Sequence, residues 1–362
     1  IDALFLESEM IKLLSLEELA KSLGLEFSEV KKVVNSRKIE VFNIGDEEFI
    51  REEDGTDIFF LVELESSDSK VNVSESEPGK YDKRNKLNNL TGKEWMPETK
   101  SFWYQKGLGK SHPHAQIEKL HPAPFSFQDI SRLINFFTKE GDVVLDPFSG
   151  VGSTVKAAAL NNRTGIGIEL SPYWSNLSKE RLEKEVGEGI SECHTILTGD
   201  SRKVLKELQE NSVDFIVTSP PYWAILNKKA DHKVKKERIA NDLATNYSDF
   251  EEDLGNIESY AEFMDIMTED IFKQSGKILK PEKYIAIVVS DFRHKSKFIS
   301  FHSDLIQRLD NLEVEEGYKF TLQGVKVLLQ NHKSLLPYGY PFAYVENIHH
   351  QYILIFRKTK VK

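Results

Sequence analysis

The 362 residues of the chain are 40% hydrophobic, which suits one large domain with a smaller attachment. No apolar run approaches the roughly 18 residues that span a bilayer, and Asp2, Glu7 and Glu9 interrupt the apolar start, so we expect a cytoplasmic protein without a signal peptide. The lone cysteine, Cys193, excludes an internal disulfide and a cysteine zinc site. Because the net charge is −10, the protein could bind a nucleic acid only through a local basic channel on an acidic body.

Residues 1–55 have the pattern of a small winged helix-turn-helix module. Ser15 and Glu18 form a capping-box signature before a first helix, and Ser28 can start a second. Apolar residues around Gly45-Asp46 then indicate a hairpin. Basic residues on or near the second helix are candidates for DNA contact, namely Lys31, Lys32 and Arg37. A packing or dimerisation module with a solvated charged face is the alternative.

Residues 56–120 are expected to form a linker and an N-terminal arm. The stretch 64–82 is rich in Ser, Glu, Asp and Lys and contains a Pro-Gly pair, which is typical of an exposed loop. Trp95 and Trp103 follow among basic and amide residues. They are candidates for DNA contact and target recognition, and the alternatives are that they cover the cofactor or form a hydrophobic brace.

Residues 121–362 alternate between strand and helix patterns. Strands are predicted at 143–145, 165–170, 195–197, 215–217 and 284–289, with helices over 151–160, 173–185, through Leu205 and Leu208, and over 260–279. This alternation predicts an α/β fold, a doubly wound, mostly parallel sheet of the Rossmann type. Two late strands, 325–329 and 352–356, are expected to pair antiparallel.

The turn after the first of these strands has the features of a nucleoside site. Gly150 and Gly152 allow the backbone to approach a ligand, and the following helix offers free N–H groups. Glu169 ends the second strand, where an acid accepts hydrogen bonds from ribose hydroxyls. Asp200 ends the third strand, within reach of an adenine amino group, although it is also placed to cap a helix.

Two motifs together carry a family resemblance. Asp146-Pro147-Phe148-Ser149-Gly150-Val151-Gly152-Ser153-Thr154, followed by Ser219-Pro220-Pro221-Tyr222, resembles the amino-methyltransferase family of DNA-modifying enzymes, and His121-Pro122-Ala123-Pro124-Phe125 looks like that family's motif X. The resemblance covers roughly residues 85–358. It implies the cofactor S-adenosylmethionine and a set of cofactor-binding residues, namely His121, Pro122, Phe125, Asp146, Phe148, Gly150, Gly152, Ser153, Thr154, Glu169, Asp200 and Ser219.

The segment Thr218–Trp223 follows a predicted strand and reaches the same sheet edge as the glycine turn. By resemblance to the family, the catalytic residues are Ser219, Pro220, Pro221 and Tyr222. The Ser219 hydroxyl and the Pro220 carbonyl would accept the two hydrogens of the target amine. The two prolines stiffen the loop, and Tyr222 would stack on a base rotated out of the duplex. Serine favours cytosine N4 in this family, and adenine N6 remains the alternative.

Basic residues beside the catalytic loop predict phosphate contacts, with a solvated surface loop as the alternative. The further DNA-binding candidates are Trp223, Lys228, Lys233, Lys235, Lys236 and Arg238. The family that the chain resembles often carries a target-recognition domain between the two motifs or after the last strand, whereas only about seventy residues separate the motifs here. Target recognition is therefore expected from the N-terminal 120 residues, the 224–256 loop, the 291–350 region, or several of these together.

The sequence therefore predicts a site-specific DNA methyltransferase of a restriction-modification or defence system. Its partners would be double-stranded DNA and a cognate restriction endonuclease, with no membrane, and it would act as a monomer or homodimer. No metal site is predicted, because His349-His350 lacks further ligands at metal-binding spacing. An RNA amino-methyltransferase and a non-catalytic DNA-binding regulator are the rival interpretations.

Overall fold

The computed structural model describes residues 13–23, 26–36, 39–45, 47–51, 81–105, 114, 116–121, 125–223, 250, 252–294, 296–330 and 335–361. The chain divides into two compact units, Ile1–Pro78 and Gly79–Lys362. The sequence placed boundaries at residues 55 and 120, whereas the arm that follows residue 80 is part of the large unit. Within the described residues, no helix has the length and apolar character needed to cross a bilayer.

The small unit contains the two helices and the hairpin that the sequence predicts. Its elements are β1 (Leu13–Ser15), α1 (Leu16–Leu23), α2 (Phe27–Ser36), β2 (Phe42–Ile44) and β3 (Glu47–Arg51). β3 lies between β1 and β2 in an antiparallel sheet, and β1 is an addition to the predicted pattern. The helices and the sheet share a core that includes Leu16, Val30, Val34 and Ile50. That this unit is a winged helix-turn-helix module stays a prediction.

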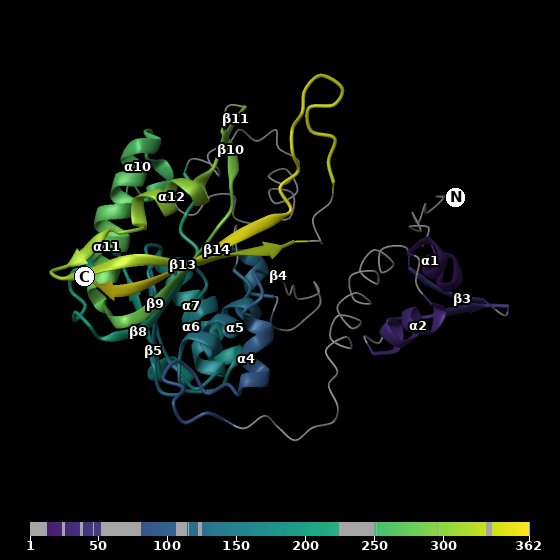
Figure 1. Cartoon of the computed structure of the whole chain (residues 1–362), viewed down its shortest axis with the longest axis horizontal. Coiled ribbons are helices and arrows are strands. Elements are labelled where there is room, and N and C mark those ends of the chain that lie inside the picture. Colours follow the sequence, from purple (N-terminus) through teal and green to yellow (C-terminus); the bar gives the residue numbers. More distant parts are fainter. Residues whose placement is uncertain are drawn as a thin grey trace, which may run out of the picture. The chain divides into compact units, whose positions relative to one another are not determined.

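The large unit is built on a nine-stranded sheet (Figure 1). Its parallel half has the order β7 (Thr195–Thr198), β6 (Thr164–Glu169), β5 (Val143–Asp146), β8 (Val213–Thr218) and β9 (Leu279–Val289). Because the strand order reverses at β5, the sheet is doubly wound, as predicted, and a crevice is expected at the carboxyl ends of β5 and β8.

The antiparallel half continues from β9. It consists of β14 (His350–Lys360), β13 (Tyr318–Leu329) and β12 (Glu313–Glu315), with β4 (Phe102–Tyr104) added parallel to β13. The predicted antiparallel pairing of the late strands is confirmed. Two reversals of direction make β13 run the same way as β9, so the loop after Leu329 leaves from the carboxyl edge of the parallel strands.

Side chains of the central strands alternate between two hydrophobic cores, as expected for a sheet buried on both faces. Val144 and Phe215 face the core of α5 (Phe127–Phe137) and α6 (Ser153–Leu160). Leu145 and Ile216 face the opposite core. That core is made by α10 (Tyr260–Ile266), a π-helical turn (Met267–Phe272), α11 (Lys273–Ile278) and α12 (Phe301–Leu309).

The remaining elements are short, with one exception. They are α4 (Gly92–Glu98), α7 (Pro172–Glu185), α8 (Ser201–Val204), 3₁₀ turns at Glu118–Leu120, Ile190–Cys193 and Leu254–Asn256, and the hairpin of β10 (Phe292–His294) and β11 (Lys297–Ile299). Two predicted elements are corrected. The helix after Asp200 ends at Val204 rather than continuing through Leu208, and the helix predicted over 260–279 is interrupted by the π turn.

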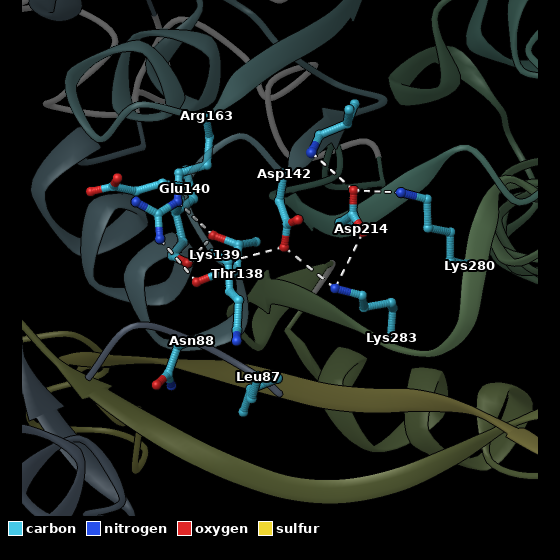
Figure 2. Close-up of polar contacts among 12 residues, drawn as sticks. Leu87, Asn88, Thr138, Lys139, Glu140, Asp142, Arg163, Asp214, Lys280 and Lys283 are labelled. Atoms are coloured by element: carbon cyan, nitrogen blue, oxygen red, sulfur yellow. Dashed lines mark hydrogen bonds and ion pairs between the residues drawn. The ribbon is translucent and has the colours of Figure 1, made fainter. Parts of the chain in front are cut away.

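Polar contacts fasten the amino edge of the sheet, opposite the crevice (Figure 2). The Asp214 carboxylate accepts hydrogen bonds from the Val143 amide at 3.1 Å and from Lys280 Nζ at 2.7 Å. Lys283 Nζ lies 3.2 Å from Asp214 and 3.3 Å from Asp142. The pKa of Asp214 is lowered, because these lysines and amides outweigh the opposing effect of burial. These contacts hold the amino edge of the sheet together, and the candidate site is therefore sought at the opposite, carboxyl edge.

Candidate active site

A cleft of about 960 Å³, including its open mouth, lies at the carboxyl ends of β5, β6 and β8. It is lined by residues of the glycine turn, by residues that follow β6 and β7, and by the loop after β8. The structure therefore brings together the two sequence motifs that the chain separates by about seventy residues. The predicted site residues in its wall are His121, Phe125, Asp146, Phe148, Gly150, Ser153, Glu169, Asp200, Ser219, Pro221 and Tyr222.

The glycine turn needs glycine at both positions. Gly150 has a φ of 51° and Gly152 a φ of 73°, a region that other residues rarely adopt. A Cβ on Gly152 would lie 1.9 Å from the Ser178 hydroxyl, and one on Gly150 would lie 3.2 Å from Nε2 of His121. The turn is thus packed between α7 and the His121 segment, with its backbone at the cleft.

Asp146 joins the cofactor-type motif to the catalytic loop. Its carboxylate accepts hydrogen bonds from the hydroxyls of Thr154 and Thr218, each at 2.6 Å, and from the Phe148 amide at 2.9 Å. Burial raises the pKa of this carboxyl against those hydrogen bonds. Because Thr218 immediately precedes Ser219, Asp146 fixes the start of the predicted catalytic loop, Ser219–Tyr222, relative to the glycine turn.

Glu169 is positioned by two backbone amides. Its carboxylate accepts from Gly150 at 2.9 Å and from Ser171 at 2.8 Å. Burial raises the pKa of Glu169 to about 7. The carboxylate thus holds the glycine turn and also lines the cleft. With this pKa, the fraction of Glu169 that is ionised changes with pH around neutrality.

Asp200 both caps a helix and lines the cleft. Its carboxylate accepts from the Arg202 amide at 2.9 Å, as an N-cap of α8 does, and it pairs with the Arg202 guanidinium at 2.8 Å. The two interpretations of this residue from the sequence are therefore compatible.

The catalytic loop presents Ser219, Pro221 and Tyr222 to the cleft, while Pro220 is buried. The Tyr222 hydroxyl accepts from the Ser290 amide at 3.0 Å and from Gln351 Nε2 at 3.3 Å. Burial raises the pKa of this phenol against hydrogen bonds that include one with Ser219. The hydroxyl end of the ring is therefore anchored by the residue that follows β9 and by β14.

Several cleft residues carry no sequence motif. Part of the wall comes from a segment about thirty residues beyond the predicted catalytic loop, namely Glu252, Asp253 and Leu254. No local sequence pattern indicates that these residues belong to the site. Trp174 packs its ring edge-on against His121 with 5.0 Å between centroids. The Ser149 hydroxyl is buried and has no hydrogen-bond partner among the described residues. Five carboxylates and no lysine or arginine line the described part of the cleft, which suits a cationic ligand.

A buried ion cluster fixes the His121 segment beside the glycine turn. Arg181, fully buried on α7, pairs with Glu185 at 2.9 Å and with Glu118 at 2.7 Å. The same guanidinium donates to the Ser153 hydroxyl at 2.9 Å. Lys156 completes the cluster at 2.5 Å from Glu185. Glu118 lies three residues before His121, so this cluster ties the predicted motif X to α6 and α7.

Two tryptophans proposed to contact DNA are instead core residues. Trp103 is 4% exposed, and the cations of Arg132 and Lys326 lie over its ring, 3.9 Å and 4.4 Å from the centroid. Trp223 is 8% exposed and donates its indole hydrogen to the Ile257 carbonyl at 2.7 Å. Their burial corrects both assignments.

The other DNA-contact candidates have different placements. Trp95 is half-buried, packing on Phe136 with 4.8 Å between ring centroids, as a brace would. Lys31 is exposed and paired with Glu48 at 2.9 Å, and Lys32 is exposed. Several predicted residues lie outside the described part of the chain, namely Arg37, Pro122, Lys228, Lys233, Lys235, Lys236 and Arg238. Among the described residues, no group of three or more histidine, cysteine, aspartate or glutamate side chains could hold a metal ion.

Comparison with known proteins adds independent information. Residues 23–180 match a family described as DNA methylase; this range includes the glycine turn and ends before the Ser219–Tyr222 loop. An orphan methyltransferase, M.BamHII of Bacillus amyloliquefaciens, is 40% identical over 82 residues, which are 22% of this chain and 31% of the relative. The type II methyltransferase M.BglI of Bacillus subtilis is 33% identical over 140 residues, 35% of this chain and 38% of the relative.

A third relative modifies RNA by its name. The tRNA (guanine(10)-N2)-dimethyltransferase of Methanocaldococcus jannaschii is 31% identical over 126 residues, 34% of this chain and 35% of the relative. In all three cases the match spans less than two fifths of the relative's length.

Proposed function

We propose that this chain, which is similar to DNA methylases over residues 23–180, is an amino-methyltransferase of the N4/N6 type that transfers a methyl group from S-adenosylmethionine to the exocyclic amino group of a DNA base. One observation carries the proposal. Ser219, Pro221 and Tyr222 line the same cleft as Gly150 and Glu169. A ligand held by the glycine turn therefore faces the loop that would hold the acceptor amine.

The cleft residues fit this cofactor. When bound, S-adenosylmethionine supplies an electrophilic methyl group on a positively charged sulfur. The carboxylates of the wall would stabilise a cationic molecule. The buried Ser149 hydroxyl has no hydrogen-bond partner among the described residues, and a polar ligand could provide one. Glu169 would accept hydrogen bonds from ribose hydroxyls and Asp200 from the adenine amino group, and the Gly150–Gly152 backbone permits close approach of a ligand.

The catalytic loop would prepare the acceptor. The lone pair of an aromatic amine is delocalised into its ring, so the nitrogen is a poor nucleophile. Two acceptors, the Ser219 hydroxyl and the Pro220 carbonyl, would bind the two amine hydrogens and favour a tetrahedral nitrogen. Thr218 is held by Asp146 and Tyr222 by Ser290, so the acceptors are positioned before the base arrives. The base must leave the duplex to reach them.

The choice of base is cytosine N4, on the serine at position 219, with adenine N6 as the alternative. The test is to incubate the chain with labelled S-adenosylmethionine and unmodified duplex DNA, digest the DNA and identify the labelled nucleoside. We expect N4-methylcytosine. N6-methyladenine would overturn the choice of base, and the absence of label from DNA would overturn the proposal.

The division of labour within the cleft has its own test. Pro221→Ala and Tyr222→Ala should reduce methyl transfer while cofactor affinity stays close to that of the wild type. A collapse of cofactor affinity in either variant would contradict the assignment of this loop to the acceptor.

RNA is the second candidate substrate, supported by the match to the tRNA (guanine(10)-N2)-dimethyltransferase. Parallel reactions on transfer RNA and duplex DNA distinguish the two, and label only in RNA would decide for RNA. A non-catalytic regulator is disfavoured by the intact cleft.

A restriction-modification setting is supported by the name of one relative, the probable type III restriction-modification enzyme HindVI Mod subunit of Haemophilus influenzae, which is 47% identical over 67 residues. A cognate endonuclease, a monomeric or homodimeric state and a cytoplasmic location stay predictions.

A further inference from the structure

An exposed aromatic surface lies on the segment before β14, residues 335–349, here named the aromatic loop. Tyr340 is 81%, Phe342 93% and Tyr344 83% exposed. Figure 1 shows this segment, in yellow, projecting away from the sheet. Three large rings so exposed within five residues are costly in water, and such groups mark an interaction site.

The rings stand on an ordered support. Asn347 makes two hydrogen bonds to the backbone of Leu336, one at 3.0 Å and one at 2.9 Å, which close the base of the loop. The Gly339 carbonyl accepts from the amides of Phe342 at 2.7 Å and Ala343 at 2.8 Å, which forms a compact turn at the tip. A pre-formed aromatic surface binds with little further loss of conformational entropy.

The aromatic loop is continuous with the candidate active site. It lies between β13 and β14 at the carboxyl edge of the sheet. Directly after the loop, in the first two residues of β14, the His350 carbonyl accepts from the Ser290 hydroxyl at 3.3 Å and Gln351 donates to the Tyr222 hydroxyl at 3.3 Å. The loop and the cleft therefore share one edge of the sheet, the edge at which a nucleic acid whose base enters the cleft would lie.

Charge selects the part of the nucleic acid that the loop contacts. Glu346 is the only charged residue from 335 to 349, so the loop cannot neutralise phosphates. Aromatic rings bind nucleic acids through base faces, and such faces are uncovered where a duplex is opened. A protein partner seated on these rings would compete with the substrate at the same edge.

We propose that the aromatic loop stacks on the bases next to the nucleotide that leaves the duplex, and so holds the opened DNA at the cleft. This inference rests on the proposed DNA methyltransferase function. It gives Tyr340, Phe342 and Tyr344 a role in contacting the DNA substrate, separate from that of the residues proposed to bind the cofactor or the acceptor amine.

The experiment compares the wild type with the triple variant Tyr340→Ala/Phe342→Ala/Tyr344→Ala. After the modified position has been mapped with unmodified duplex DNA, methyl transfer is measured on two oligonucleotide duplexes. One is fully paired, and the other has an abasic site opposite the target, so that the target is already unpaired. The matched control is Met96→Ala, which removes an apolar side chain that is 73% exposed on α4.

The triple variant should raise the KM for the paired duplex by at least about tenfold, the loss expected from one or more stacking contacts. Its cofactor Kd and melting temperature should stay unchanged, because the three rings are exposed. The abasic duplex should recover most of the loss, and Met96→Ala should behave like the wild type.

Three results would overturn the inference. The first is a triple variant whose KM for the paired duplex stays within twofold of that of the wild type. If that variant also shows altered self-association, the three rings belong to a protein contact. The second is an equal loss on both duplexes, which would mean docking without stacking on an opened step. The third is a wild type that never labels DNA, which contradicts the proposed function itself and is seen before any variant is made.

Discussion

Replacement of Arg181 by methionine tests whether the buried ion cluster supports the cleft. The cluster contains two cations, Arg181 and Lys156, and two anions, Glu118 and Glu185. Arg181→Met keeps a long apolar stem and leaves one cation with two carboxylates. Removing one partner of a buried ion pair costs about 3–5 kcal/mol, because a charge is left without compensation.

The structure places the expected cost at the lower end of that range. Glu185 keeps Lys156 at 2.5 Å, so the deficit falls on Glu118, whose side chain is 16% exposed and can recover some hydration. The Ser153 hydroxyl and the Val151 carbonyl also lose a donor. We therefore expect Arg181→Met to lower the free energy of unfolding by about 3 kcal/mol.

The assay is urea denaturation followed by far-ultraviolet circular dichroism, together with calorimetric titration of S-adenosylmethionine. Cofactor affinity should fall as well, because the Glu118 segment carries His121 beside Gly150. Adding Glu118→Gln to the variant removes the unpaired charge and should restore at least about 1 kcal/mol. The matched control is Lys184→Met on the same helix, an exposed pair with Glu180, which should cost at most about 1 kcal/mol.

The reasoning would be refuted if Arg181→Met cost no more than the Lys184→Met control. It would also be refuted if Glu118→Gln destabilised the Arg181→Met background, because the remaining carboxylate would then not be the source of the cost.

Three further substitutions probe the cleft. Glu169 has a pKa of about 7 and accepts hydrogen bonds better when it is ionised. As the pH rises toward 7, cofactor affinity should therefore increase by up to about tenfold per pH unit, and above pH 7 it should level off. Glu169→Gln should flatten this profile in calorimetric titrations. Because the folded pKa lies above the ordinary 4.5, the contribution of Glu169 to the free energy of unfolding should decrease as pH rises from about 4.5 to about 7. Gly152→Ala should cost about 1–2 kcal/mol from its positive φ alone, with a further loss in melting temperature that Ser178→Ala partly restores. Thr218→Val removes a donor from buried Asp146 and should cost about 1.5–3 kcal/mol with a lower kcat; a kcat equal to that of the wild type would separate Asp146 from the catalytic loop.

The parallel sheet was predictable because its strands are buried on both faces. Val143–Leu145 and Phe215–Val217 are continuous apolar runs, and each is followed by a motif that needs a sheet edge. The glycine positions were predictable for the same physical reason: a turn that approaches a ligand and carries positive φ angles excludes most side chains.

Burial of single side chains was not predictable, because it depends on partners far away in the chain. Trp103 is covered by Lys326, more than two hundred residues later, and β4 joins the sheet only by pairing with β13. In the same way, Asp253 reaches the cleft from a segment about thirty residues beyond Tyr222 that has no motif of its own. Residue type gives the capacity for a contact, and chain topology decides whether the contact is with the core or with the solvent.

The position of the catalytic loop depends on supports from two sides. Asp146 holds Thr218 from the cofactor side of the sheet, while Ser290 and Gln351 hold the Tyr222 hydroxyl from the side of the antiparallel strands. The acceptors proposed for the amine lie between these two anchors. The proposed binding of DNA to the aromatic loop would therefore act, through Gln351 of β14, on Tyr222, which is the residue proposed to stack on the base.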